Sequence, residues 1–318
     1  MIEKIKRNLL FSLIIAALLY LALSVYADFE SVLKAFTEFG IILIPVLLAL
    51  SYLNYYTRFL KWHYYLSILG INIAWKNSFI IFMSGLIMSV TPGKVGELLK
   101  SYMLKKDYSE PVSKTAPIVL AERLTDFISL LILGIAGAYF FDYGQVIVII
   151  TTVCFVLFVL LLSNKTLTEY TLKLFSKFNF LKKYIEKIET AYNSIYVLLR
   201  PRPFFYMIAL SFVSWFFECL GFYLILDNFK LDFSLFWASF TYAFSTIIGS
   251  ITMLPGGLGV TDGSITYLLL LGNVQESTAV AATFIVRAVT LWFAVVVGIV
   301  TLIYYRKHFG NIENYGSL

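Results

Sequence analysis

Hydrophobic positions in this chain gather into runs long enough to cross a membrane, separated by short polar stretches. A membrane-spanning helix needs about 20 predominantly apolar residues. Two further apolar runs, at 76–104 and 234–272, are shorter or interrupted. The uninterrupted runs predict spans at 8–26, 39–60, 117–140, 145–163, 204–226 and 279–304.

Each interrupted run contains a Pro-Gly-x-x-Gly motif, TPGKVGE from Thr91 to Glu97 and LPGGLGV from Leu254 to Val260. Proline removes a backbone donor and glycine permits left-handed dihedrals, so each motif predicts a helix break. Broken backbone at membrane depth survives only when it is buried in protein or lines a cavity, and a pair of breaks indicates a transporter's binding site. The residues expected at the breaks are Pro92, Gly93, Gly96, Pro255, Gly256, Gly257 and Gly259.

Composition places the chain in one class. Of its 318 residues 60% are hydrophobic and only 14% charged, whereas soluble domains carry about a quarter charged residues. We therefore expect an all-α, polytopic transmembrane helical bundle forming a single integral membrane domain over 1–318. The net charge of +6 indicates basic cytoplasmic loops rather than nucleic-acid binding. No zinc-ligand or nucleotide-binding pattern occurs, so neither a metal nor a cofactor is expected.

Charge distribution predicts the orientation. If the N-terminus is cytoplasmic, most Lys and Arg residues, including Arg58, Lys61 and Lys100, fall in cytoplasmic segments, as does the C-terminus. The two interrupted runs then dip into the membrane from opposite sides as re-entrant segments. This predicts two inverted halves, 39–140 and 204–304, joined by an amphipathic cytoplasmic connector over 164–203.

Charged side chains within spans are the first candidates for function, because each costs ~2.5–3.5 kcal/mol at the bilayer centre. Arg123 is flanked by Glu122 and shares a helix face with Asp126. Arg287 is expected about 12 Å deep, with Asp262 or Glu218 as its partner. Either arginine could hold a lipid phosphate, since a guanidinium is a planar fork for phosphate. The alternatives are a structural ion pair for Arg287 and a snorkelling cluster for Arg123.

The two breaks supply further candidates. Lys94 and Glu97 stand at the first break, where Glu97 is either a helix-capping acid or a proton or head-group site. Asp262 follows the second break and is expected to cap the helix after it. The candidate lipid or head-group site therefore consists of Lys94, Glu97, Glu122, Arg123, Asp126, Glu218, Asp262 and Arg287.

The strings TPGKVGELLKSYML, AERLTDFISLLIL and LPGGLGVTDGSI resemble the lysylphosphatidylglycerol synthase transmembrane-region family, also described as flippase-like. The resemblance extends over about residues 8–305. In bacterial two-part members it implies a polytopic domain that moves aminoacylated lipid between leaflets, while a separate soluble domain makes that lipid. Because this chain ends at Leu318, no such soluble domain and no lysyl transfer are expected.

What the resemblance implies here is a lipid-handling fold in a prokaryotic cell membrane, with its cargo open. The first hypothesis is a flippase-like translocator of a phospholipid or lipid-linked head group, without catalytic residues. A second hypothesis is a membrane-embedded transferase, glycosyl or aminoacyl, that acts on a lipid-phosphate substrate. A third is the membrane subunit of a separately encoded soluble synthase. The expected partners are thus a membrane lipid and, in the third case, that synthase; the oligomeric state stays open.

Overall fold

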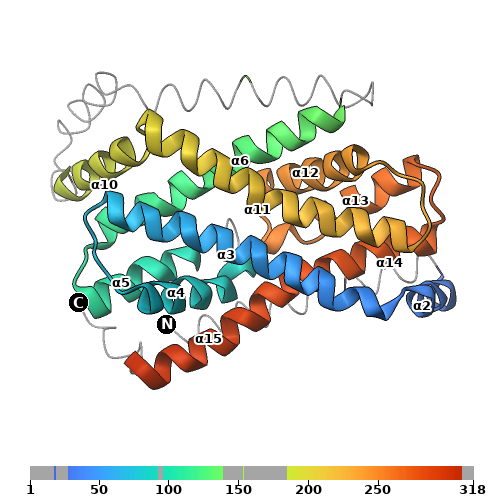
Figure 1. Ribbon diagram of the computed structural model, residues 1–318, viewed down its shortest axis with the longest axis horizontal. Helices are drawn as coiled ribbons and strands as arrows, with labels where there is room; N and C mark the ends of the chain where they lie inside the picture. The colour runs from blue at the N-terminus through green and yellow to red at the C-terminus, as the bar shows by residue number, and fades with distance from the viewer. Residues whose placement is uncertain (1–17, 19–27, 92–95, 139–152, 154–184, 310–318) are drawn as a thin grey trace.

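The computed structural model describes residues 28–91, 96–138 and 185–309, together with Leu18 and Val153. Break residues Pro92 and Gly93 and candidate Lys94 lie outside the described residues, as do the predicted span 145–163 and almost all of the predicted span 8–26. The described residues are helices joined by short turns, with no strand among them, which confirms the all-α prediction (Figure 1).

Three helical stretches in the described part are long and apolar enough to cross a membrane: Ile41–Ile68, Pro201–Asn228 and Glu276–Phe309. Helix α6 has 27 residues, which is also sufficient length, but it carries charged side chains in its middle. The structure is that of an integral membrane helical protein.

The helices are α2 (Phe29–Glu38), η1 (Ile41–Leu43), α3 (Ile44–Ile68), α4 (Trp75–Gly85), η2 (Leu86–Val90), α5 (Leu99–Tyr108), α6 (Val112–Ala138), α10 (Ile185–Leu198), α11 (Pro201–Asn228), α12 (Leu235–Ile251), η4 (Pro255–Gly257), α13 (Val260–Leu271), α14 (Glu276–Arg287), η5 (Ala288–Trp292) and α15 (Phe293–Phe309).

The helices before and after α10 pack against one another crosswise. Helix α6 lies along α12, whereas α15 lies along α4 and η2 (Figure 1). The long helices α3 and α11 cross between these two pairs, where Asn54 Nδ2 donates to the carbonyl of Ser214 at 2.7 Å. The last helix before α10, α6, therefore packs on a helix from after α10, and the last helix after α10, α15, packs on helices from before it.

The same kind of helix end follows α3 and α11. After α3, Gly70 has φ 70°, and the Ile71 N–H donates to the Leu66 carbonyl at 2.9 Å. After α11, Lys230 has φ 57°, and the Leu231 N–H donates to the Leu226 carbonyl at 3.1 Å. Both are left-handed helix ends of the same kind. Such repetition is what two repeated halves would produce; their insertion from opposite sides of a membrane stays a prediction.

Two hydrophobic clusters fill the interior, and polar side chains separate them. One cluster lies around Trp62, and the other around Phe222. Helix α6 contributes Ile118, Ala121 and Leu124 to the first cluster and Leu130, Leu131 and Leu133 to the second. We call the polar layer between the clusters the polar band; it includes Glu122, Arg123, Thr125, Asp126 and Ser129 of α6 and the buried Ser211 and Ser214 of α11.

The described part of the connector does not lie freely on a surface. In α10, Tyr192, Ile195 and Leu198 are buried in the first cluster, and the helix packs along α6. Ile188 of the same helix is exposed. The packing of α10 is directed by α6, a partner that local periodicity does not show. Connector residues before Ile185 lie outside the described part.

Candidate functional site

A cavity of about 330 Å³ opens in the polar band, between the two regions that contain the Pro-Gly motifs. Its wall is built from helices far apart in sequence: α3 and α6, α11 and α12, the turn η4, and η5. Three arginines reach it from three different elements, Arg58, Arg123 and Arg287. Two acidic side chains, Asp126 and Glu218, line it as well. The cavity therefore gathers four of the eight predicted site residues.

The second motif breaks the chain as predicted. Helix α12 ends at Ile251, the turn η4 covers Pro255–Gly257, and α13 starts at Val260. Gly256, Gly257 and Gly259 have φ values of 59°, 67° and 84°, a region that strains any residue with a Cβ. A Cβ on Gly256 would lie 2.9 Å from Leu291 Cδ2 and 3.6 Å, an ordinary contact distance, from Val90 Cα, so the turn packs against η5 and η2. The positive φ values are the reason that glycine is favoured here.

Arg287 holds this turn. Its Nε donates to Asp262 Oδ1 at 3.0 Å, and its Nη2 donates to the Gly256 carbonyl at 2.6 Å. Asp262 accepts in turn from the Gly259 N–H through Oδ2 at 2.8 Å, which caps the start of α13. Of the two partners expected for Arg287, the structure places Asp262 in the ion pair. These contacts give Arg287 a structural contribution, whatever else it binds.

We expect Asp262→Asn to lower the free energy of unfolding by about 1–3 kcal/mol, because a neutral amide replaces the charged acceptor of Arg287. The amide oxygen can still accept one hydrogen bond, so the turn should remain formed. Thermal unfolding of the purified protein in detergent measures the loss. Thr278→Ala, on the same helix as Arg287 and on no charged group, is the control; an Asp262→Asn midpoint equal to that of the control would contradict the prediction.

At the first motif, the described part begins again at Gly96. The Gly96 N–H donates to Thr91 Oγ1 at 3.1 Å, and residues 96–98 form a 3₁₀ turn before α5. A Cβ on Gly96 would lie 2.6 Å from Thr91 Oγ1 and 2.7 Å from Met88, so the turn is closely packed on η2. The helix after this motif runs to Tyr108, four residues beyond the end of the interrupted apolar run 76–104.

Glu97 extends from this turn toward two arginines. Both of its carboxylate oxygens accept from Arg123 Nη2 at 2.7 Å, and Oε1 lies 3.8 Å from Arg58 Nη2. Its side chain is 7% exposed. The contact joins the first Pro-Gly region to α6 and α3, in the way that Asp262 joins the second to Arg287.

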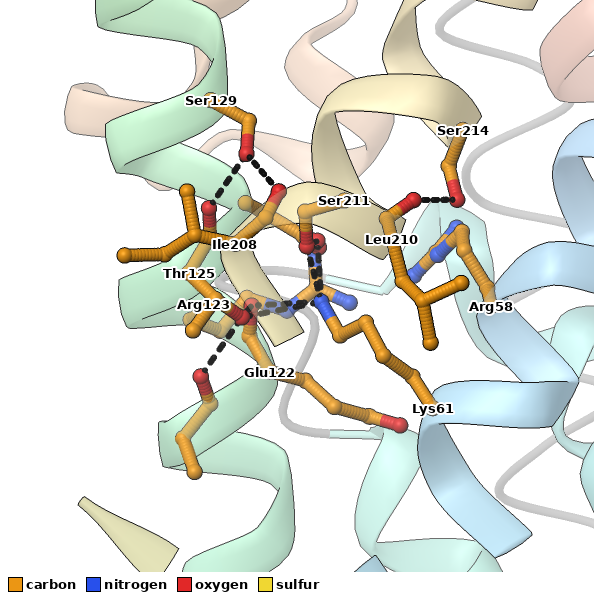
Figure 2. Close-up of polar contacts among 12 residues, drawn as sticks. Arg58, Lys61, Glu122, Arg123, Thr125, Ser129, Ile208, Leu210, Ser211 and Ser214 are labelled. Carbon is orange, nitrogen blue, oxygen red and sulfur yellow. Dashed lines mark hydrogen bonds and ion pairs between the residues drawn. The ribbon is translucent and has the colours of Figure 1, made fainter. Parts of the chain in front are cut away.

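Asp126 belongs to a second, fully buried network (Figure 2). Lys61 Nζ extends from α3 to Asp126 Oδ1 at 2.6 Å and to Thr125 Oγ1 at 2.9 Å. Lys61 Nζ also donates to Ser211 Oγ of α11, which itself donates to Asp126 Oδ1 at 2.9 Å. The network ties three long helices together in the polar band.

Glu122 points away from both of these groups. Its Oε2 accepts from Lys100 Nζ of α5 at 2.8 Å, and the pair is almost completely buried. The same ammonium lies 4.5 Å from the centroid of the Trp62 ring and 4.9 Å from that of Phe82, so it also makes cation–π contacts with both rings. Glu122 is therefore part of the packing under the cavity rather than of its wall.

Glu218 lines the cavity from α11. Tyr242 of α12 donates its hydroxyl to Glu218 Oε2 at 2.7 Å. Tyr55 lies on the same wall and donates to the Thr290 carbonyl at 2.5 Å, within the π-helical turn η5. Such π turns free a carbonyl from the helical pattern and are frequent at functional sites. The sequence left Glu218 open as an alternative partner of Arg287; the ion pair that the structure gives for Arg287 is with Asp262.

Arg58, Lys61 and Lys100 lie on helices α3 and α5 rather than in loops. The sequence analysis counted all three in cytoplasmic segments, and the side of the membrane on which they lie stays a prediction. Helix α3 continues to Ile68, beyond the predicted end at residue 60, because Phe59, Trp62 and Tyr65 bury one of its faces. That helical spacing was the signal in the sequence; the charged partners on α6 were not visible in it.

Metal ligands do not cluster in the described part of the chain. No group of three or more His, Cys, Asp or Glu side chains there lies close enough to hold an ion. Cys219 is a free, buried thiol of α11 within the second hydrophobic cluster. The chemistry available at the cavity is therefore that of guanidinium, carboxylate and hydroxyl groups.

Comparison with known proteins places the whole arrangement in a family. The chain is 27% identical over 291 residues to a UPF0104 membrane protein of Methanothermobacter thermautotrophicus, covering 83% of this chain and 85% of that protein. Two UPF0104 membrane proteins of Methanocaldococcus jannaschii are 26% identical over 67% of this chain and 91% of theirs, and 24% identical over 93% and 94%. The model of the family described as "Lysylphosphatidylglycerol synthase TM region" matches residues 9–298. This membrane protein therefore belongs to the lysylphosphatidylglycerol synthase TM region family.

Proposed function

We propose that this protein moves a phospholipid or a lipid-linked head group from one side of the membrane to the other, through the cavity in the polar band. One observation carries the proposal: the cavity joins guanidinium groups in its interior to an exposed apolar rim. Ile251, Met253 and Leu254, at the end of α12 and in the turn after it, line the cavity and are 60%, 69% and 43% exposed. An amphiphile can contact both the guanidinium groups and the apolar rim, whereas a soluble anion would contact the guanidinium groups alone.

The size of the cavity supports a head group rather than a whole lipid. About 330 Å³ is at the small end of ligand pockets, which run from about 300 to 1,000 Å³. Acyl chains would therefore stay outside, on the apolar rim. The head group would enter between Arg58, Arg123 and Arg287, whose guanidiniums suit a phosphate.

The position of the cavity supports transport. It lies beside both regions that contain the Pro-Gly motifs. Each region has an acid paired with an arginine on the second helix after the motif: Glu97 with Arg123 of α6, and Asp262 with Arg287 of α14. Transporters commonly bind their substrate at such paired breaks, between two repeats that move against each other. We place the protein in the prokaryotic cell membrane, with both termini cytoplasmic, as the charge distribution predicts.

A vesicle assay tests the proposal. Purified protein reconstituted into vesicles is expected to exchange a fluorescent anionic phospholipid between leaflets. Arg123→Gln is expected to slow this exchange about tenfold or more, because charge-assisted hydrogen bonds to the phosphate are lost. Arg202→Gln, an exposed arginine at the start of α11, is the matched control and should exchange lipid as the original protein does.

Absence of exchange by well-folded protein would contradict the proposal. The next measurements would then be turnover with lipid-phosphate sugars, for the glycosyl or aminoacyl transferase hypothesis, and co-purification with a soluble synthase, for the membrane-subunit hypothesis. Equal rates for Arg123→Gln and Arg202→Gln would remove the cavity from the lipid path.

A further inference from the structure

Arg58 is a cation of low solvent exposure whose hydrogen-bonding groups are almost unused. Its side chain is 12% exposed, and it makes no hydrogen bond to any residue that the structure describes. The nearest acidic oxygen within these residues is Glu97 Oε1, 3.8 Å away from Nη2. Figure 2 shows the side chain on α3 without a dashed contact to the residues drawn. Arg58 lines the cavity, so its donors face the space where a ligand would lie.

The two buried lysines of this region, Lys61 and Lys100, have close partners for their charges. Lys61 has an acid, two hydroxyls and a carbonyl around its ammonium, and Lys100 has an acid and two aromatic faces. Burial of a charge is costly unless hydrogen bonds and an opposite charge compensate it. The bundle supplies such compensation for both lysines and leaves it incomplete for Arg58. A bound anion would complete it.

Arg123 is also incompletely used, although it has a short contact. A single nitrogen, Nη2, donates to both oxygens of Glu97, so the two-pronged pairing that a guanidinium favours is absent. Its Nη1 lies 3.7 Å from Asp126 Oδ2, and its Nε has no hydrogen-bond partner in the described part of the chain. Asp126 already accepts from Lys61 and Ser211.

We propose that Arg58 and Arg123 form the phosphate subsite of the cavity, and that the Glu97 carboxylate occupies this subsite when no ligand is bound. The inference rests on the proposed function, since it names where the lipid's phosphate binds. The phosphodiester of a phospholipid has two unesterified oxygens, as a carboxylate has, but it is not tethered to the chain and can place one oxygen at each guanidinium. Glu97 lies 2.7 Å from Arg123 but 3.8 Å from Arg58.

Glu97 is then an internal competitor. Ligand and carboxylate carry the same charge and use the same two guanidiniums, so binding of one displaces the other. The charged groups that face this position are Arg58 on α3, and Arg123 with its neighbours Glu122 and Asp126 on α6; the two α6 acids are held by Lys100 and Lys61. Neither acid can easily replace Glu97, because each has its own lysine.

Binding to the purified full chain in detergent tests the subsite. Two probes separate the sources of phosphate: a short-chain phosphatidylglycerol, and inorganic phosphate. Arg58→Gln is expected to weaken binding of the lipid about tenfold or more, whereas Arg202→Gln leaves it unchanged. Glu97→Gln is expected to strengthen binding about tenfold, since the competing charge is removed. Thermal unfolding without ligand establishes that each variant is folded, and Arg58→Gln should not unfold earlier, because it loses no hydrogen bond within the described residues.

The outcomes separate this inference from the function on which it rests. Unchanged lipid affinity in a folded Arg58→Gln variant would overturn the subsite and leave a lipid-binding cavity standing. Weaker binding in folded Glu97→Gln would show that Glu97 contributes to the ligand site, and would overturn its assignment as competitor. Arginine-dependent binding of inorganic phosphate, without binding of the lipid, would support the subsite and remove the lipid function.

Discussion

A Gly298→Ala variant is expected to lose about 3 kcal/mol of its free energy of unfolding, the upper end of the usual cost of overpacking. A Cβ on Gly298 of α15 would lie 2.1 Å from the Ile87 nitrogen, 2.7 Å from Ile87 Cα and 2.8 Å from the Leu86 carbonyl carbon. All three atoms are backbone, so no rotamer change relieves the overlap. Helix α15 must instead move away from η2, which it packs against along much of its length. Thermal unfolding of the purified protein in detergent measures the effect.

The chain offers a matched control for this variant in Gly134 of α6. Gly134 is also a buried glycine of a long helix, yet a Cβ there would meet nothing within 4 Å. Gly134→Ala is therefore expected to unfold no earlier than the original protein, because alanine costs less in a helix than glycine. Equal losses for the two alanine variants would mean that α15 does not approach η2 as closely as described.

Replacement of Lys61 by methionine is expected to cost about 3–5 kcal/mol, because it leaves a buried carboxylate without its cation. Asp126 Oδ1 would keep Ser211 as a donor, and its Oδ2 would keep only the 3.7 Å contact with Arg123. Methionine has a similar length, so packing changes little and the loss reports on charge. The shift of the thermal midpoint in detergent measures it.

Two further variants isolate the ion pair. Lys61→Met combined with Asp126→Leu removes both charges, and is expected to recover much of the stability lost by the single replacement. Lys34→Met, on the exposed side of α2, changes the same residue type where no buried acid depends on it. If the double variant were less stable than Lys61→Met, Asp126 would have a stabilising contribution independent of Lys61.

The sequence was sufficient to locate the second break and its main contact. Proline and glycine act on the backbone of their own residues, so the motif at Pro255–Gly257 predicts a break whatever packs around it. Gly256, Gly257 and Gly259 indeed have positive φ. The depth of Arg287 in an apolar run likewise required a buried acid, and few acids were near enough in the predicted topology. Asp262 was one of two candidates and is the partner found.

The sequence indicated no partners for Arg58, Lys61 and Lys100, because the counting of charges assumes that a cation belongs to a loop, whereas these three lie on α3 and α5. Each is separated from the residues around it by at least 22 positions: Lys100 from Glu122, Arg58 from Glu97, and Lys61 from Asp126 and Ser211. Contacts of that range depend on how helices cross, which a local pattern does not encode. The least expected member of the proposed subsite, Arg58, is for this reason the one that only the structure could indicate.

On helix α6 too, the sequence did not predict which groups the charged side chains contact. Glu122, Arg123 and Asp126 are near neighbours, and their spacing predicts one local network. The structure instead directs them to three partners on three elements: Lys100 on α5, Glu97 in the turn before it, and Lys61 on α3. Only the 3.7 Å contact between Arg123 and Asp126 corresponds to the predicted network. The spacing predicted that these charges would be paired, whereas the packing of the helices determines which groups pair with them.

The crosswise packing of α6 on α12 and of α15 on α4 sets an order of biogenesis. A ribosome delivers α3 to α6 before α12 exists, so α6 enters the membrane with its charges and one long face uncovered. Lys61 and Lys100 are then already present to neutralise Asp126 and Glu122, whereas Ser211 arrives only with α11. The early ion pairs thus lower the insertion cost of a helix that carries charges in its middle.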